Sequence, residues 1–373
     1  MRLKSESKVI CKQPDRYIGW PTVAKTAAGE LVAVFSGDRE EHVCPYGKDQ
    51  LVRSKDNGMN WTAPETIHDS PLDDRDAGLL ITRKGTMILS WFTWDFPEAK
   101  ITNNAAWSMG WRSYLDSVTQ ADRRKHHGYW IRRSADNGKT WEEPVRTPSS
   151  APHGPIQLKD GRLLYVGKGW LDEFGGAAVS AAESKDDGKT WNVIWSQALT
   201  NAEQQRLSEP HAVELADGRI IAMLRYSGSK TEAEGHLWQT ESADGGHSWT
   251  PPVMTPIWGY PPHLILLKDG RVLCTYGYRK APFGQRACLS YDGGKTWDIE
   301  REIIIRSDAL TDDLGYPASV ELADGTIVTV YYQVDKPNEK TCLMMTRWTP
   351  PPFDPPAKRN DGLNVSMGGQ GPH

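Results

Sequence analysis

The chain has 373 residues, more than one compact hydrophobic core usually organises, so several cores or a closed array of repeats are expected. Its formal net charge is −4 and it has no basic run, which argues against nucleic acid as a partner. No stretch approaches the roughly 18 apolar residues of a membrane span. The N-terminus has no apolar signal segment, so we expect a cytoplasmic protein, or a secreted or periplasmic one if a signal was removed.

Six similar hairpins follow one another along the chain. Each consists of an alternating strand, a turn with Gly and a second strand, which is a strong short-range hairpin pattern. The six copies occupy residues 21–35, 77–91, 154–167, 211–224, 263–276 and 318–332. A further strand follows each hairpin, so the repeating unit is larger than the hairpin alone.

A second motif, S-x-D-x-G-x-x-W, follows the third strand of five of these units. Its copies are residues 54–61, 134–141, 184–191, 242–249 and 290–297. The Asp side chain of such a motif can accept the backbone N–H groups of its own turn, and the Gly can take a positive φ. We therefore predict five self-capping turns, each followed by a fourth strand, and assign these residues no chemistry.

Four antiparallel strands in each of six units predict an all-β fold, a six-bladed β-propeller that spans residues 1–348. The last unit has a third strand at 341–348 but no motif after it. We expect residues 8–12 to supply its fourth strand and close the ring, because closure removes open sheet edges.

Two segments and the cysteines do not fit the repeat. Residues 94–129 interrupt the second unit and include a helix-like stretch at 113–127, so we expect either a flap over the site or a peripheral excursion. Residues 349–373 are rich in Pro and Gly, which is typical of an irregular tail. The five cysteines favour buried thiols, with one disulfide between Cys274 and Cys288 as the alternative.

Counting from the hairpin turns identifies residues that should meet at the propeller axis. In every blade strand one starts at the end of the propeller opposite the hairpin turn. The position of interest lies nine residues before the Gly of that turn. We call these six positions the axial ring. They are Trp20, Asp76, Pro152, Glu209, Pro261 and Tyr316.

More polar residues belong to the same end of the propeller. His211 and His263 lie two residues further along the inner strands, on the same face because strands have a period of two. The strand-two ends and one strand-three start carry basic residues, namely Arg39, Lys168, Arg225, Arg279 and Arg286. Converging arginines repel one another unless an anion or a carboxylate such as Glu209 compensates, so we predict a ligand site that prefers carboxylate or phosphate.

With these motifs the sequence resembles the sialidase superfamily, six-bladed propellers with Asp boxes, over almost the whole chain. The segment SEPHAVELADGRIIAMLR resembles the one that carries the glutamate and the second arginine of the family's carboxylate-binding triad, here Glu209 and Arg225. GYPASVELADGTIVTVYY resembles the segment of the nucleophilic tyrosine, here Tyr316. Arg286 falls where the family has its third arginine, with Arg279 as the alternative.

The resemblance implies a coherent chemistry. A carboxylate on the anomeric carbon would repel a carboxylate nucleophile, and sialidases use a neutral Tyr instead. Glu209 would serve as the base for Tyr316, because free Tyr has a pKa near 10. The arginines would hold the substrate carboxylate and stabilise an oxocarbenium-like transition state.

The sequence departs from the family pattern at two places. Gly19 occupies the position of the first triad arginine, and Arg16 is three residues away. The position of the general-acid aspartate holds His42, which follows Glu41. Asp76 is the other candidate acid, and a His can also donate a proton near neutral pH.

Several residues keep two interpretations. Arg39 matches a family arginine near the acid loop, and Arg75 with Asp73 and Asp74 either grips substrate or a cation or lies in a solvated loop. His211 and His263 are candidate ligands for sugar hydroxyls, and the spacing of the histidines supports no metal site. Four tryptophans either stack on a sugar or pack internally: Trp20, Trp94, Trp107 and Trp111.

The function we expect is exo-acting hydrolysis of a glycoside with a terminal acidic sugar, with retention and without a cofactor. Tyr316 and Glu209 would form the nucleophile pair, and His42 or Asp76 would be the acid. A lyase acting on uronic-acid glycans and a non-catalytic propeller that binds acidic sugars are the alternatives. The partner is an acidic glycan, and the sequence does not define the oligomeric state.

Overall fold

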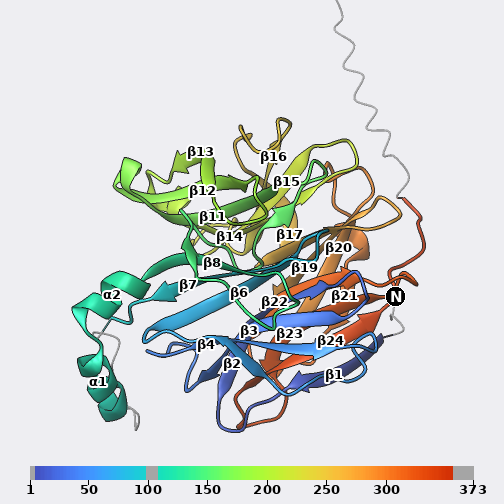
Figure 1. Ribbon diagram of the computed structural model, residues 1–373. Helices are drawn as coiled ribbons and strands as arrows, with labels where there is room; N and C mark the ends of the chain where they lie inside the picture. Colours follow the sequence, from blue (N-terminus) through green and yellow to red (C-terminus); the bar gives the residue numbers. More distant parts are fainter. Residues whose placement is uncertain (1–4, 98–107, 356–373) are drawn as a thin grey trace, which may run out of the picture.

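The computed structural model describes residues 5–97 and 108–355, which form six four-stranded antiparallel sheets (Figure 1). The predicted six-bladed propeller is confirmed. In five blades the strands lie in chain order, from the inner strand to the outer one. This order places the starts of all inner strands at one end of the propeller, the arrangement from which the axial ring was predicted.

The strands of the first three blades are β2 (Tyr17–Lys25), β3 (Leu31–Arg39), β4 (Lys48–Ser54), β5 (Glu65–His68), β6 (Asp73–Ile81), β7 (Met87–Trp94), β8 (Gly128–Ser134), β9 (Val145–Arg146), β10 (Ile156–Gln157), β11 (Leu163–Leu171), β12 (Gly176–Ser184) and β13 (Asn192–Ala198). Those of the last three are β14 (Leu207–Glu214), β15 (Ile220–Tyr226), β16 (His236–Ser242), β17 (Val253–Trp258), β18 (Pro262–Leu266), β19 (Val272–Tyr278), β20 (Gly284–Ser290), β21 (Ile303–Arg306), β22 (Gly315–Glu321), β23 (Ile327–Val334), β24 (Thr341–Trp348) and β1 (Ser5–Cys11). The short helices are α1 (Ser108–Ser117), α2 (Gln120–His126), α3 (Ala202–Gln205), η2 (Asp172–Phe174) and η3 (Ile299–Arg301).

The ring is closed by the N-terminal strand. β1 pairs antiparallel with β24, with Ser5 opposite Trp348, and so becomes the outer strand of the sixth blade. The prediction that residues near 8–12 close the ring is confirmed. Strands from both ends of the described chain therefore share one sheet, which ties the first and last blades together.

Hydrophobic cores lie between neighbouring blades. Ile88 and Tyr165 belong to the cluster between the second and third blades, and Leu31 and Val330 to the cluster between the first and the sixth. Each of the other four blade interfaces has a cluster of its own. A closed array of such interfaces explains how a chain of this length folds without one large core.

The five Asp-box turns cap themselves in the predicted way. In every box the Ser hydroxyl donates to the Asp carboxylate at 2.8 Å. The same carboxylate accepts the backbone N–H four residues on, at 2.8 or 2.9 Å. These aspartates, at the turns between third and fourth strands, are Asp56, Asp136, Asp186, Asp244 and Asp292. Their role is structural.

The insertion in the second blade contains two helices where the sequence predicted one. α1 and α2 project together beyond the strands of this blade (Figure 1). Trp111 packs in a cluster with Cys44 and Phe96, and its indole N–H donates to Glu40 at 2.5 Å, so this tryptophan packs internally. Residues 98–107, which belong to the predicted flap and include Trp107, and 356–373 of the predicted tail lie outside the described residues. None of the helices in the described ranges has the length and apolar surface needed to cross a membrane.

All five cysteines are buried free thiols. Cys274 and Cys288 stand opposite each other on β19 and β20, as the sequence suggested, but they are not joined. Burial raises the pKa of both thiols, so neither is a reactive thiolate. The preference for buried thiols is confirmed.

Candidate active site

Four positions of the axial ring share an unusual backbone conformation. Trp20, Asp76, Glu209 and Tyr316 have φ between 49° and 56°, in the left-handed region that non-glycine residues seldom adopt. Each interrupts the pairing of its inner strand with the second strand of its blade. Such bulges re-aim side chains and cluster at functional sites. The same strained feature in four blades marks this end of the propeller as the site.

Tyr316, Glu209 and Arg225 form one hydrogen-bonded unit. The Tyr316 hydroxyl donates to Glu209 Oε1 at 2.6 Å. Arg225 Nη1 donates to both oxygens of the same carboxylate, at 3.0 and 2.9 Å. Arg225 can reach Glu209 because it stands opposite Ser208 in the β14–β15 hairpin. A phenol from the sixth blade thus meets a carboxylate and a guanidinium from the fourth.

The environment keeps the Tyr316 phenol protonated at neutral pH. Burial raises its pKa well above 10, and the negative charges of Glu209 and Asp76 act in the same direction, whereas Arg225 opposes them. The proton therefore stays on the tyrosine until a neighbouring base accepts it. Glu209 is within hydrogen-bond distance to do so.

Asp76 provides a second carboxyl group with a different proton affinity. Burial raises the pKa of Asp76 to about 7; Arg75 lowers it, and the charge of Glu209 raises it further. Its Oδ1 is buried and has no partner among the described residues. A carboxyl group that remains protonated near neutral pH is suited to donate a proton.

Two arginines stand at the Tyr316–Glu209 pair, and one predicted arginine does not. The guanidinium carbons of Arg225 and Arg279 lie 4.2 and 5.3 Å from the ring centre of Tyr260. Arg286 instead donates to the carbonyls of Arg306 and Pro282. The assignment of Arg286 to the site is therefore wrong, because β20 is a third strand and lies further from the axis. Arg279, the alternative, lies near Tyr260, and its Nε and Nη2 donate to the carbonyl of Leu314 at 3.1 and 2.8 Å, so its role at the site stays a prediction.

Arg39 is also unavailable to a substrate. It is fully buried, and its two terminal nitrogens donate to the Asp73 carboxylate at 2.5 and 2.9 Å. Arg75 is buried too, with its guanidinium carbon 4.3 Å from the ring centre of Trp20. The prediction that Arg39 binds substrate is wrong, and so is the alternative of a solvated loop for Asp73, Asp74 and Arg75, because β6 starts at Asp73 and these residues are buried. Substrate binding by Arg75 stays a prediction.

Replacing Asp73 by Ala is expected to destabilise the fold by about 3–5 kcal/mol, because it leaves the buried Arg39 charge without its partner. Urea unfolding measured by circular dichroism checks this value. Asp69→Ala is the matched control: Asp69 is half-exposed and pairs with Lys48 at 3.3 Å, so its loss is expected to cost about 1 kcal/mol or less. Equal losses for the two variants would contradict the buried-pair argument.

His42 lies at the edge of the site with an aspartate that the sequence analysis missed. Its side chain is 44% exposed, and its Nδ1 lies 2.7 Å from the Tyr17 hydroxyl and 3.2 Å from Asp313 Oδ1. Asp313 also accepts the hydroxyls of Tyr17 and Tyr332, at 2.9 and 3.1 Å. His42 therefore remains a candidate proton donor, held by a fixed carboxylate.

The position of the first triad arginine holds Gly19, which has no side chain, and the space around it is tight. A side chain on Gly19 would start 3.3 Å from the ring of Tyr17 and 3.6 Å from that of Tyr332. Arg16 is turned to Asp38 and Glu40, at 3.3 and 3.8 Å, and does not replace it. Neither Gly19 nor Arg16 therefore supplies the guanidinium group of the first triad position.

The predicted wall histidines are buried beneath the site. The rings of His211 and His263 stack with centres 4.4 Å apart, and His153 packs edge-on against both. His211 Nδ1 accepts the N–H of Leu264 at 2.9 Å, and burial lowers its pKa to about 3. These rings are neutral packing elements, so the assignment of His211 and His263 as sugar ligands is withdrawn. No cluster that could hold a metal ion occurs among the described residues.

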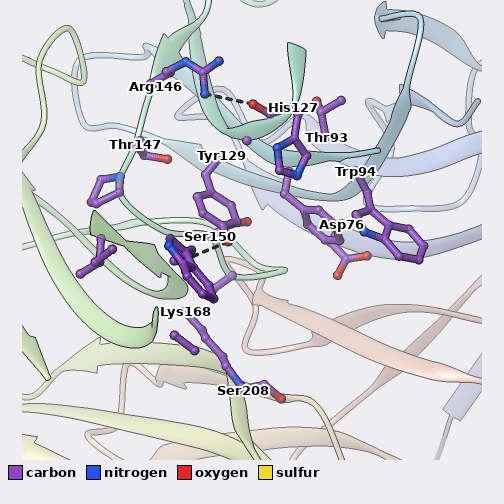
Figure 2. A pocket seen from close by; sticks show the side chains of 18 of the residues that line it. Asp76, Thr93, Trp94, His127, Tyr129, Arg146, Thr147, Ser150, Lys168 and Ser208 are labelled. Carbon is purple, nitrogen blue, oxygen red and sulfur yellow. Dashed lines mark hydrogen bonds between the residues drawn. The ribbon is translucent and has the colours of Figure 1, made fainter. Parts of the chain in front are cut away.

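A cleft of about 880 Å³ opens beside this site. Asp76 and Glu209 line its inner end, and its walls come from the second and third blades. Figure 2 shows Asp76 and Trp94 on one side of it and Lys168 and Ser208 on another. Burial lowers the pKa of Lys168, and the charge of Glu209 opposes this effect. The cleft gives a ligand access to both carboxyl groups.

Two residues of the site were missed for different reasons. Tyr332 stands opposite Gly315, the same register relation that Arg225 has to Ser208, so the count used for Arg225 would have found it. Asp313 lies in the loop before β22, where strand periodicity sets no direction for a side chain.

Solved structures with a similar fold include a protein of unknown function, a sialidase and an arabinanase. A protein of unknown function from Dyadobacter fermentans is 25% identical with a TM-score of 0.75, covering 93% of this chain and 98% of that one. NanB sialidase from Streptococcus pneumoniae is 13% identical (TM-score 0.66; 92% and 70% covered). An alpha-L-arabinanase from Penicillium chrysogenum, complexed with arabinobiose, is 16% identical (0.61; 92% and 98%). No curated protein matches the chain significantly.

The fold is a six-bladed propeller, an architecture that this chain shares with the solved sialidase and arabinanase structures. Residues 110–335 match the family model described as a BNR repeat-like domain, which is more than half of the chain. The protein belongs to the BNR repeat-like family.

Proposed function

We propose that the protein is an exo-acting glycoside hydrolase of the sialidase type that releases a terminal acidic sugar with retention of anomeric configuration. The observation that carries this proposal is the 2.6 Å hydrogen bond from the Tyr316 hydroxyl to Glu209, whose carboxylate is held by Arg225. A nucleophile, its base and the group that orients the base are thereby in contact.

In the first half of the reaction Tyr316 Oη attacks the anomeric carbon and its proton passes to Glu209. The bond to the leaving-group oxygen breaks, and Asp76 gives that oxygen a proton. In the second half Glu209 returns its proton to the Tyr316 oxygen as water, deprotonated by Asp76, attacks the anomeric carbon. Both carboxyl groups regain their starting state, and two displacements retain the configuration.

The charge of the site fits a sugar with a carboxylate. The guanidinium carbons of Arg225 and Arg279 both lie near Tyr260, 4.2 and 5.3 Å from its ring centre, and supply positive charge that a substrate carboxylate would favour. A substrate carboxylate at this place would favour a phenol over a carboxylate as the nucleophile, because like charges repel. Gly19 stands where the sialidase pattern has its first triad arginine, so that guanidinium group is missing, which favours an acidic sugar other than the usual sialic acid.

The test is a screen of sialosides, related ulosonosides and uronides, followed by proton NMR of the first product. The expected result is release of one acidic sugar whose initial anomer equals that of the substrate. An inverted initial anomer would refute the Tyr316 mechanism. Rising ultraviolet absorbance from an unsaturated product would indicate the lyase, and tight binding without turnover would indicate a binding protein.

A further inference from the structure

The third blade has a shortened inner strand, and this opens space beside the site. β10 has only two residues, whereas the inner strands of the other blades have five to nine. Pro148, Pro152 and Pro155 lie in the segment before it, and proline cannot donate a ladder hydrogen bond. The cleft lies at this blade, directly next to Asp76 and Glu209.

Aromatic side chains form much of the cleft wall. Trp94 and Tyr129 come from the second blade and Trp170 from the third. Trp170 is 62% exposed, more than any other large hydrophobic side chain in the described ranges. A large exposed aromatic surface beside a polar site commonly marks where a ligand binds.

Contacts of Tyr129 join the two walls of the cleft. Tyr129 Oη accepts the backbone N–H of Trp170 at 3.2 Å. A Cβ on Gly169 would lie 2.9 Å from the Tyr129 ring, so this ring packs directly on the β11 backbone.

The charges along the cleft do not favour an anion. Arg146 lines the cleft, but its guanidinium group is already engaged: it donates to the carbonyls of Arg124, Lys125 and His127 and stacks on Trp130 at 4.3 Å (Figure 2). Lys168 donates to the carbonyl of Gln205. Asp172 also lines the cleft, beside the aromatic residues.

We infer that this cleft binds the leaving-group part of the substrate, as a neutral oligosaccharide of at least two sugar units. The inference rests on the proposed function, because the acidic sugar would occupy the Tyr316 side and the bond to be cleaved would lie between Glu209 and Asp76. The aromatic walls would stack on the apolar faces of the sugar rings. The volume lies in the upper part of the roughly 300–1,000 Å³ range of small-molecule sites.

The test measures binding without turnover. Lactose, cellotriose and trigalacturonate are titrated by calorimetry into the Tyr316→Phe variant, alone and combined with Trp170→Ala. At least one neutral saccharide is expected to bind saturably at millimolar concentration, and Trp170→Ala is expected to weaken it by about tenfold. Phe353→Ala, which removes another exposed aromatic ring outside the cleft, is the control and is expected to change the Kd by less than about twofold.

The inference is overturned if neither neutral saccharide binds or if Trp170→Ala leaves their Kd unchanged. Tighter binding of trigalacturonate overturns it only if Trp170→Ala weakens that binding too, because the acidic-sugar site at Tyr316 is itself expected to bind a uronic acid. Failure of the proposed function is recognised separately. It would appear as absence of hydrolysis in the glycoside screen, whereas hydrolysis of an aryl glycoside together with no binding of the neutral saccharides would refute only the cleft assignment.

Discussion

Under the proposed function, Tyr316→Phe is expected to lower kcat on the acidic glycoside by about 10³-fold or more, because it removes the oxygen proposed as the nucleophile and leaves Glu209 with no proton to accept. The fold should persist, since the Tyr316 ring packs in the cluster between the first and sixth blades and Phe keeps that ring. Initial rates with the substrate found in the screen, together with thermal unfolding, check both parts.

Tyr331→Phe is the matched control for this experiment. Tyr331 is a fully buried tyrosine of the same blade, and its hydroxyl lies 2.8 Å from that of Thr346, outside the site. Loss of the Tyr331 hydroxyl is expected to change stability and to leave kcat within about twofold of the wild-type value. Turnover by Tyr316→Phe at the wild-type rate would eliminate the tyrosine mechanism. A trapped glycosyl-enzyme carried on a different residue would do the same.

Asp76→Asn is expected to lower kcat by about 10²–10⁴-fold on a substrate with an alkoxide leaving group, because no acid then protonates that group. On a 4-nitrophenyl glycoside the loss should be much smaller, since nitrophenolate leaves without a proton. In the wild type, activity should fall as pH rises through about 7, the pKa of Asp76. The variant should lack this decline.

Asp76→Asn is expected to lower activity but to raise the stability of the fold above neutral pH. The pKa of Asp76 in the folded state lies above its ordinary value. Between about pH 4 and pH 7 the folded state therefore binds more protons than the unfolded state, and the free energy of unfolding falls as the pH rises through this range. Asn carries no charge to bury, so Asp76→Asn should raise the free energy of unfolding by about 1–3 kcal/mol at pH 8 and leave it nearly unchanged at pH 4.

His42→Gln separates the two candidate acids. If the decline near pH 7 and the dependence on the leaving group persist in His42→Gln and vanish in Asp76→Asn, Asp76 is the acid. The opposite pattern would assign the role to His42, held by Asp313. In that case Asp76 would be a buried carboxyl group of the ring without a catalytic task.

The axial ring shows how far register counting reaches. Asp76, Glu209 and Tyr316 are 107 or more residues apart in sequence, yet the same offset from a hairpin turn selects all three. The structure gives all three the same left-handed conformation, and Tyr316 donates to Glu209. Strand period and turn position are local properties, so they can be read from neighbouring residues.

The arginines show what register counting does not predict, namely the partner of each side chain. Arg39, Arg225, Arg279 and Arg286 all stand at strand ends near the site, but Arg39 is paired with Asp73 of the next blade, and Arg286 is turned to carbonyls of its own blade. A long flexible side chain can reach hydrogen-bond partners from several segments of the chain. Its direction is therefore decided by what surrounds it in space.

The amino-acid sequence by itself determined the six blades, their turns and the positions that face the axis, because alternation and turn chemistry act over a few neighbouring residues. Only the tertiary structure decided which charges remain open to a ligand, that Asp313 joins His42, and that a cleft lies over the third blade. These features depend on contacts between different blades and on loops without a period, and burial among such contacts sets the proton affinities of Tyr316 and Asp76.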